Sequence, residues 1–137
     1  MIKLIKNRLV LFIVTAALLF SACASNLNIS EDMSPADLIQ RAQEASDRNR
    51  YNTALQYYQA LRDRNNNNID LIITAEYEIA FIHYKQRKYD QAREELNAVL
   101  EYYNTPDEEL LPLQFKRLSQ IVLQSIEEKE SRSLFPK

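Results

Sequence analysis

The sequence predicts an all-helical fold, and two observations support this prediction. Apolar residues recur at spacings of three and four from Ala75 to Ile82 and again from Ala92 to Tyr103, which is the period of two amphipathic helices joined by a polar turn. Glycine is absent from all 137 residues, which disfavours hairpin-rich β folds. Any backbone position that needs a positive φ angle is therefore expected to be asparagine, or the fold is expected to do without such positions.

The composition is that of one ordinary globular domain. Hydrophobic residues make up 46% of the chain and charged residues 26%, with a net charge of −2. Removal of residues 1–22, which hold three basic and no acidic residues, would leave 14 basic against 19 acidic residues. With no basic stripe and no nucleic-acid motif, we expect no nucleic acid partner.

Residues 1–22 are predicted to be a signal peptide. They begin with three basic residues, continue through an apolar run from Leu9 to Phe20 and end in small residues. The apolar run is short for a helix that spans a bilayer. The sequence therefore predicts export from the cytoplasm.

The end of this signal resembles a bacterial lipobox, Phe20-Ser21-Ala22-Cys23. The resemblance implies that Cys23, the single cysteine, becomes the acylated first residue of the mature protein, anchored on the periplasmic side of a membrane, with the outer membrane expected. Residues 23–33 would then form a flexible tether. Ordinary secretion with cleavage after Ala24, and an uncleaved anchor, stay open.

Residues 34–131 are predicted to form the helical domain. Ser34, followed by Pro35, marks a helix start, and this helix is expected to end near Asn49. A second helix is expected over about 52–64, and the asparagines at 65–68 form a loop that can cap the next one. Two further helices are expected over about 69–86 and 90–103.

Thr105-Pro106-Asp107-Glu108 is typical of a capping box, but Pro112 limits the helix that it would start to a short turn. A last helix is then expected to run to about Glu130. Its apolar stripe is expected to cover the open end of the preceding helices. That stripe comprises Leu111, Phe115, Leu118, Val122 and Ser125 or Ile126, and residues 132–137 are expected to fray.

The central motifs Tyr84-Lys85-Gln86, Tyr89-Asp90-Gln91-Ala92 and Leu96 resemble a tetratricopeptide repeat, and residues 50–61 repeat residues 88–99 at an offset of 38. The resemblance implies a fragment of a right-handed α-solenoid: two antiparallel helix pairs and a C-terminal capping helix. Small residues allow the helix axes to approach closely where they cross. The expected packing residues are Ala42, Ala54, Tyr58, Ile79, Ala80, Ala92 and Leu96.

Catalysis is not expected, because the chain lacks a convergent nucleophile and base, a metal set or a glycine-rich phosphate loop. We predict no cofactor and no metal. His83 is expected to be a packing residue rather than a ligand. The adjacent glutamates at 94–95, 108–109 and 127–128 are expected to be solvated surface.

Tyr77, Phe81 and Tyr84 form an aromatic stripe at i, i+4 and i+7. The resemblance places this stripe on the concave side, where Lys85 and Gln43 would give a polar rim to a partner-binding surface. Alternatively, the rings are core.

The resemblance implies a scaffold that binds another envelope protein, as in the repeat lipoproteins of outer-membrane and pilus secretin assembly. Self-association is possible, because solenoids normally need three units. The alternative function is a lipoprotein that binds a small hydrophobic ligand or assists a transporter.

Overall fold

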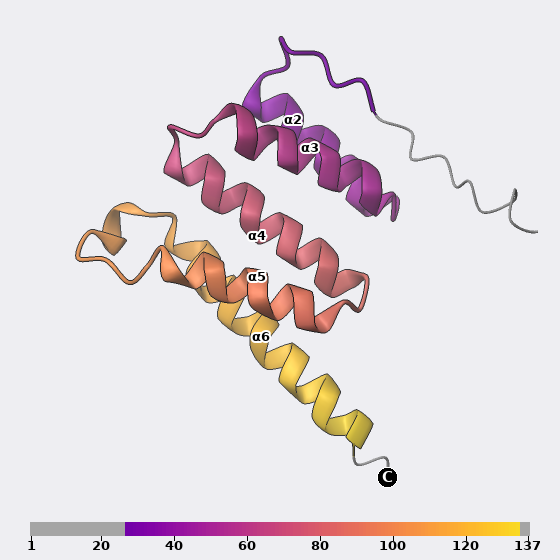
Figure 1. Cartoon of the computed structure of the whole chain (residues 1–137), viewed down its shortest axis with the longest axis vertical. Helices are drawn as coiled ribbons and strands as arrows, with labels where there is room; N and C mark the ends of the chain where they lie inside the picture. The colour runs from indigo at the N-terminus through magenta and orange to yellow at the C-terminus, as the bar shows by residue number, and fades with distance from the viewer. Residues whose placement is uncertain (1–26, 135–137) are drawn as a thin grey trace, which may run out of the picture.

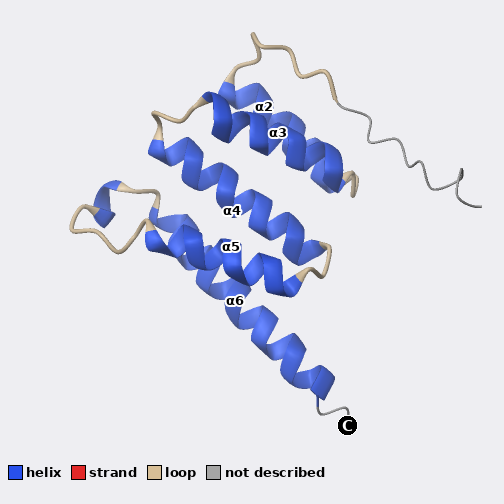
Figure 2. Ribbon diagram, in the orientation of Figure 1, coloured by secondary structure: helices blue, strands red, loops and turns tan. Residues whose placement is uncertain are grey.

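The computed structural model describes residues 27–134, and every regular element in that range is helical (Figures 1 and 2). The elements are α2 (Pro35–Asp47), α3 (Tyr51–Arg64), α4 (Ile69–Lys85), α5 (Tyr89–Glu101), a one-turn 3-10 helix (Glu108–Leu110) and α6 (Leu113–Leu134). The all-helical prediction is confirmed. The predicted signal peptide and Cys23 lie outside the described residues.

The helices form a stack in which each packs on the next along the chain. α2 packs on α3, α3 on α4, α4 on α5 and α5 on α6, and α6 also contacts α4. Figure 1 shows α2 and α3 at one end of this stack and α6 at the other. The arrangement is two helix pairs, α2–α3 and α4–α5, followed by a covering helix.

Two helix starts follow the predicted capping residues. The Ser34 hydroxyl accepts a hydrogen bond from the Asp37 amide at 3.2 Å, and Pro35 occupies the first turn of α2. The Asn68 side chain accepts hydrogen bonds from the amides of Asp70 and Leu71 at 3.1 and 3.2 Å, at the start of α4. Both side chains satisfy amides that have no partner within the helix.

The predicted capping box at Thr105 is wrong. The 3-10 helix has no side-chain cap, the Thr105 hydroxyl donates to the Tyr102 carbonyl, and the Glu108 carboxylate pairs with Lys116 at 2.5 Å. A helix that starts here can run for only about one turn before Pro112, which has no amide donor. Glu108 is therefore available for an ion pair with α6 and is not simply solvated.

The two pairs turn in the same way. Asn49 and Arg87, 38 residues apart, have φ angles of 56° and 62°. One residue further on, the Arg50 amide donates to the Ala45 carbonyl at 2.8 Å, and the Lys88 amide donates to the His83 carbonyl at 3.0 Å. This is the left-handed cap that normally favours glycine or asparagine. The expectation that asparagine takes every such position is therefore wrong for Arg87.

α4 supplies side chains to two cores. Ile79 and Ile82 pack with the first pair, whereas Ile73 and Ala80 pack with α5 and α6. Ala80 and Ala92 are fully buried, as the close approach of the two helices requires. The residues expected to pack in the repeats are all buried: Ala42, Ala54, Tyr58, Ile79, Ala80, Ala92 and Leu96.

α6 covers the second pair on a face that differs in one position from the predicted stripe. Leu118 is 38% exposed, whereas Ser119 is fully buried between Phe115 and Val122. An apolar stripe read from sequence selects leucine over serine, but the short serine side chain fits where helices approach closely. α6 also continues to Leu134, past the predicted end at Glu130 and into the segment expected to fray.

Residues 27–33, here called the strap, pack against the first pair instead of forming a free tether. The Leu27 amide donates to the Gln56 side chain at 2.9 Å. The Arg64 guanidinium donates to the carbonyls of Ser30 and Ile29 at 2.8 and 3.1 Å. Ile29 and Met33 are partly buried against the first core. The described part of the predicted tether thus belongs to the folded domain.

Candidate functional site

Aromatic rings form a continuous row along α4 and the start of α5. The ring centroids of Tyr77 and Phe81 are 5.9 Å apart, those of Phe81 and Tyr84 are 5.8 Å apart, and those of Tyr84 and Tyr89 are 6.0 Å apart. The first two pairs are stacked, which follows from their helical spacing on one face. The sequence-predicted stripe is therefore one physical unit, here called the aromatic row.

Tyr77, the first member of the row, is a core residue, and its assignment to partner binding is wrong. Its side chain is 4% exposed, and its ring lies 5.1 Å from that of Phe115 on α6. Burial, followed by the nearby Glu78 carboxylate, raises the pKa of Tyr77 to about 12. The crossing of α6 over this end of α4 removes Tyr77 from any binding surface.

Phe81 and Tyr84 remain half-buried, and lysine ammonium groups lie over their rings. The Lys85 Nζ atom is 5.3 Å from the centre of the Phe81 ring and 5.4 Å from that of Tyr51. The Lys129 Nζ atom, from α6, is 5.9 Å from the centre of the Tyr84 ring. These distances are within the range of cation–π attraction. The arrangement holds two positive charges beside exposed ring surface.

Lys85 also joins α4 to α2, because its ammonium group donates to the Ser46 hydroxyl at 2.5 Å. Phe81, Tyr84 and Lys85 of α4 therefore lie between Ser46 of α2 and Lys129 of α6. This surface, formed by Phe81, Tyr84, Lys85 and Lys129, is here called the inner face. Gln43 is exposed on α2, one turn before Ser46. It has no hydrogen bond to the aromatic row among the contacts of residues 27–134. The sequence predicts the polar rim at Lys85 and Gln43, whereas the cations over the rings are Lys85 and Lys129.

Sequence reasoning missed Glu78, which follows Tyr77 and lies seven residues before Lys85. Burial raises the pKa of the Glu78 carboxyl, and the neighbouring Lys85 ammonium and Tyr58 hydroxyl offset part of that rise. The pKa of Tyr58 is raised in turn, first by burial and then by the Glu78 and Asp47 carboxylates. The seven-residue spacing of Glu78 and Lys85, which places both on nearly the same face of α4, could have indicated this pair from the sequence.

A polar cluster of different character joins α4 to α5. The His83 Nδ1 atom lies 2.6 Å from the Glu95 carboxylate, and the Gln91 side-chain nitrogen lies 3.5 Å from the His83 Nε2 atom. A neutral imidazole satisfies both contacts, with Nδ1–H donating to Glu95 and Nε2 accepting from Gln91. His83 is buried as predicted, but Glu95 is not simply solvated.

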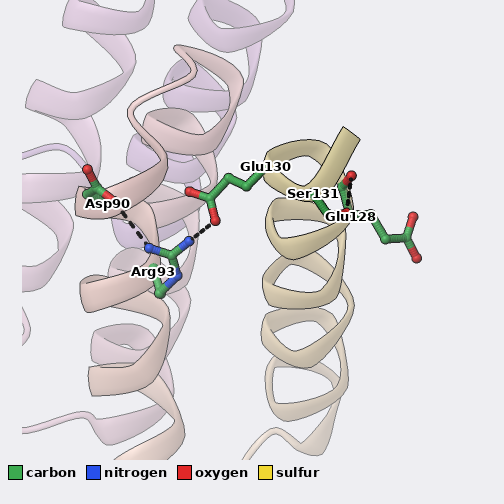
Figure 3. Close-up of polar contacts among 5 residues, drawn as sticks. All are labelled: Asp90, Arg93, Glu128, Glu130 and Ser131. Carbon is green, nitrogen blue, oxygen red and sulfur yellow. Dashed lines mark hydrogen bonds and ion pairs between the residues drawn. The ribbon is translucent and has the colours of Figure 1, made fainter. Parts of the chain in front are cut away.

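Arg93 connects α5 to α6 on the surface. Its guanidinium pairs with Asp90 at 3.2 Å on its own helix and with Glu130 on α6, as Figure 3 shows. Hydrogen bonding to Glu130 is the main cause of a raised Arg93 pKa. Next to Glu130, the Ser131 hydroxyl donates to the Glu128 carbonyl at 3.0 Å. These contacts position α6, which carries Lys129, beside the second pair.

The described range lacks both a cluster of metal-ligating side chains and a helix that could cross a membrane. Residues 27–134 contain no group of three or more histidine, cysteine, aspartate or glutamate side chains placed to hold a metal ion. Within the same residues, no helix combines the length and the apolar character needed to cross a bilayer. The inner face combines half-buried aromatic rings with two lysine ammonium groups.

The geometry defines a helix-pair repeat protein with an aromatic and cationic face. A tetratricopeptide repeat family profile matches residues 45–114, and the chain belongs to this family. An uncharacterized protein from Treponema pallidum (strain Nichols) is 36% identical over 108 residues, which cover 77% of this chain. The chain spans only 43% of that relative's length. No solved structure matches the chain significantly.

Proposed function

We propose that this protein is a lipid-anchored tetratricopeptide repeat scaffold of the cell envelope that binds another envelope protein and serves assembly on the periplasmic side. The observation that carries the proposal is the inner face, where Phe81 and Tyr84 are half-buried beneath Lys85 and Lys129. Repeat proteins of this family typically act as interaction modules, which fits a face without catalytic groups.

The chemistry of the inner face favours a protein segment that carries apolar and acidic side chains. Aromatic rings bury a large apolar area and lose little conformational entropy on binding, which makes them frequent binding hot spots. An ammonium group has three donors, and the Lys85 ammonium uses one on Ser46. A partner carboxylate could take the remaining donors while apolar side chains cover the rings.

The inner face is tested by Lys129→Glu and Tyr84→Ala in an affinity capture from native membranes. Lys129 is exposed, so its reversal removes a cation without disturbing the core. We expect at least about tenfold weaker capture for Lys129→Glu, equivalent to about 1.4 kcal/mol, with an unchanged melting temperature. Ile121→Ala, which alters a side chain 58% exposed on α6, is the matched control. Equal capture by all three variants would place the binding surface elsewhere.

The membrane anchor rests on the sequence alone. A basic start, an apolar run and small residues before Cys23 support it. Acyl chains supply about 0.8 kcal/mol per buried methylene. The Cys23→Ser variant should therefore be lost from the detergent phase or accumulate as an uncleaved precursor. Detergent-phase partitioning of the parent and the variant measures this. A processed variant that partitions like the parent would refute the anchor.

A small hydrophobic ligand is less well supported. A cavity of about 190 Å³ between α3, α4 and α5 is lined by Arg62, Glu76 and Glu95 as well as Ile79 and Ala98. Sites for apolar ligands are lined mainly by apolar and aromatic side chains. Native mass spectrometry in mild detergent distinguishes the two functions: a stoichiometric protein supports the scaffold, and a retained lipid or metabolite supports the alternative.

A further inference from the structure

The first described residues of the chain are bound to the domain, and this limits how far the domain can stand from a lipid on Cys23. The strap is held by the hydrogen bond from Leu27 to Gln56 and by the two from Arg64 to Ile29 and Ser30. Four residue steps separate Cys23 from Leu27, which span at most about 14 Å when fully extended. A domain anchored in this way would have its first helix pair close to the headgroups.

Three arginines surround the point where the strap begins. Arg41, Arg48 and Arg50 line a cavity of about 160 Å³ together with Leu27 and the acidic side chain of Glu44. All three arginines are exposed, and no ion pair of theirs is found within residues 27–134. Glu44 accepts a hydrogen bond from Gln40 on its own helix. Arg41 also lines a neighbouring cavity together with Asp32 and Asp37. The surface formed by the three arginines, here called the arginine face, has two more basic than acidic side chains in its own lining.

We propose that the arginine face rests on anionic headgroups of the membrane that holds the anchor. This inference depends on the proposed lipid at Cys23. Basic side chains near an anionic bilayer are attracted to it over roughly a Debye length, about 8 Å at physiological ionic strength. The short reach from Cys23 keeps the arginine face near that range, whereas a freely flexible tether would not orient the domain.

The orientation has a direct structural consequence. The strap and the arginine face lie at the α2–α3 end of the stack, and α6 lies at the opposite end (Figure 1). Contact between the arginine face and the bilayer directs α6 and its Lys129 away from the membrane. Tyr84 and Lys129 then lie farther from the bilayer than Lys85, which contacts Ser46 and Tyr51 beside the arginine face.

The test measures the depth of two sites in the lipidated full chain. Asn52→Cys lies beside the arginine face and Asn97→Cys lies on α5, and both positions are exposed. Each variant is labelled with a fluorophore and placed in phosphatidylcholine vesicles, with or without phosphatidylglycerol, that carry a lipid-attached quencher. In anionic vesicles we expect at least about threefold stronger quenching at position 52 than at position 97.

Substitution of the arginines separates charge from tether length. Arg41→Gln, Arg48→Gln and Arg50→Gln together should reduce quenching at position 52 to the level at position 97. Arg48→Glu alone is the second variant if the triple variant melts early, and it should reduce the difference by at least about half. Quenching that persists in both variants, or that is equal at the two positions, would overturn the proposal.

Two controls define what a failure means. Protein that does not float with either kind of vesicle contradicts the anchor, whereas protein that floats without the difference between positions contradicts only the orientation. Sodium chloride and inorganic phosphate are then compared at equal ionic strength. Equal loss of quenching supports a headgroup surface, and loss with phosphate alone would overturn it in favour of a site for a soluble phosphate.

Discussion

The two helix pairs share one turn but are closed at their outer sides by different structures. Asn49 and Arg87 take the same left-handed conformation at equivalent positions, and the backbone hydrogen bonds beside them are the same. The first pair is covered by the extended strap, through Ile29 and Met33. The second pair is covered by the 22-residue helix α6. A repeat thus specifies its own hairpin, whereas residues outside the repeat determine how the stack ends.

The largest difference in free energy of unfolding is expected between substitutions in α6 and in the strap, because α6 buries its apolar side chains more completely. Ile126 is fully buried, and Ile126→Ala should lower the free energy of unfolding by about 2–5 kcal/mol. Ile29 is only partly buried, and Ile29→Ala should cost about 1 kcal/mol. Urea denaturation of the two variants measures the difference. Equal costs would show that the strap and α6 contribute equally.

Overpacking should affect the two pairs alike. Ala92 and Ala54 are 38 residues apart and fully buried, so Ala92→Leu and Ala54→Leu should each destabilise the fold by about 1–3 kcal/mol. Glu94 is exposed, and Glu94→Leu is the control that should change stability little. Thermal melts check this. A tolerated leucine at only one position would show that the two pairs are not packed equivalently.

The turns should respond differently to glycine. A left-handed conformation costs a residue with a Cβ atom about 1–2 kcal/mol, which substitution by glycine removes. Glycine loses more conformational entropy on folding, which offsets about 0.5–1 kcal/mol of that gain. Arg87→Gly should therefore stabilise by about 0.5–1 kcal/mol. Asn49→Gly should give no gain, because asparagine tolerates this conformation and accepts a hydrogen bond from the Tyr51 hydroxyl at 2.7 Å. Urea midpoints decide between these outcomes.

Glu78, whose carboxyl group neighbours Lys85 and Tyr58, should give the smallest effect because it is only partly buried. Its pKa is raised in the folded state, so the folded protein favours the neutral acid. The stability that depends on the neutral form is complete below the unfolded pKa and is lost as the pH rises through the folded pKa. Glu78→Gln should therefore stabilise at pH 7 relative to the parent, with no advantage near pH 4. An advantage of equal size at both pH values would contradict this assignment.

The features that sequence alone predicts are those encoded within a few residues. Ser34 and Asn68 cap helices as expected because a side chain and the amides it satisfies are two or three positions apart. The pairing of helices also follows from the sequence, since short turns leave neighbouring helices no other arrangement than antiparallel contact.

The features that sequence does not predict depend on residues far apart in the chain. Tyr77 is core because α6 brings Phe115 against it, and this contact removes the first ring from the expected aromatic surface. The sequence predicts Glu95 to be solvated surface. This prediction misses its pairing with His83, because His83 is 12 residues away on another helix. The strap has the composition of a polar linker, and sequence alone predicts a free tether. Its hydrogen bonds to Gln56 and Arg64 span 29 to 35 residues, so no local pattern reveals them.

The strap also constrains the order in which the chain can fold. Contacts between helices adjacent in sequence close short loops and form quickly. Arg64 is the last residue of α3, and the carbonyls that it binds precede α2. These bonds require α3 to have folded back along α2. The strap, although it precedes α2 in the chain, is therefore the last part of the first pair to become ordered. Its exposure to proteases reports whether α2 and α3 have already docked.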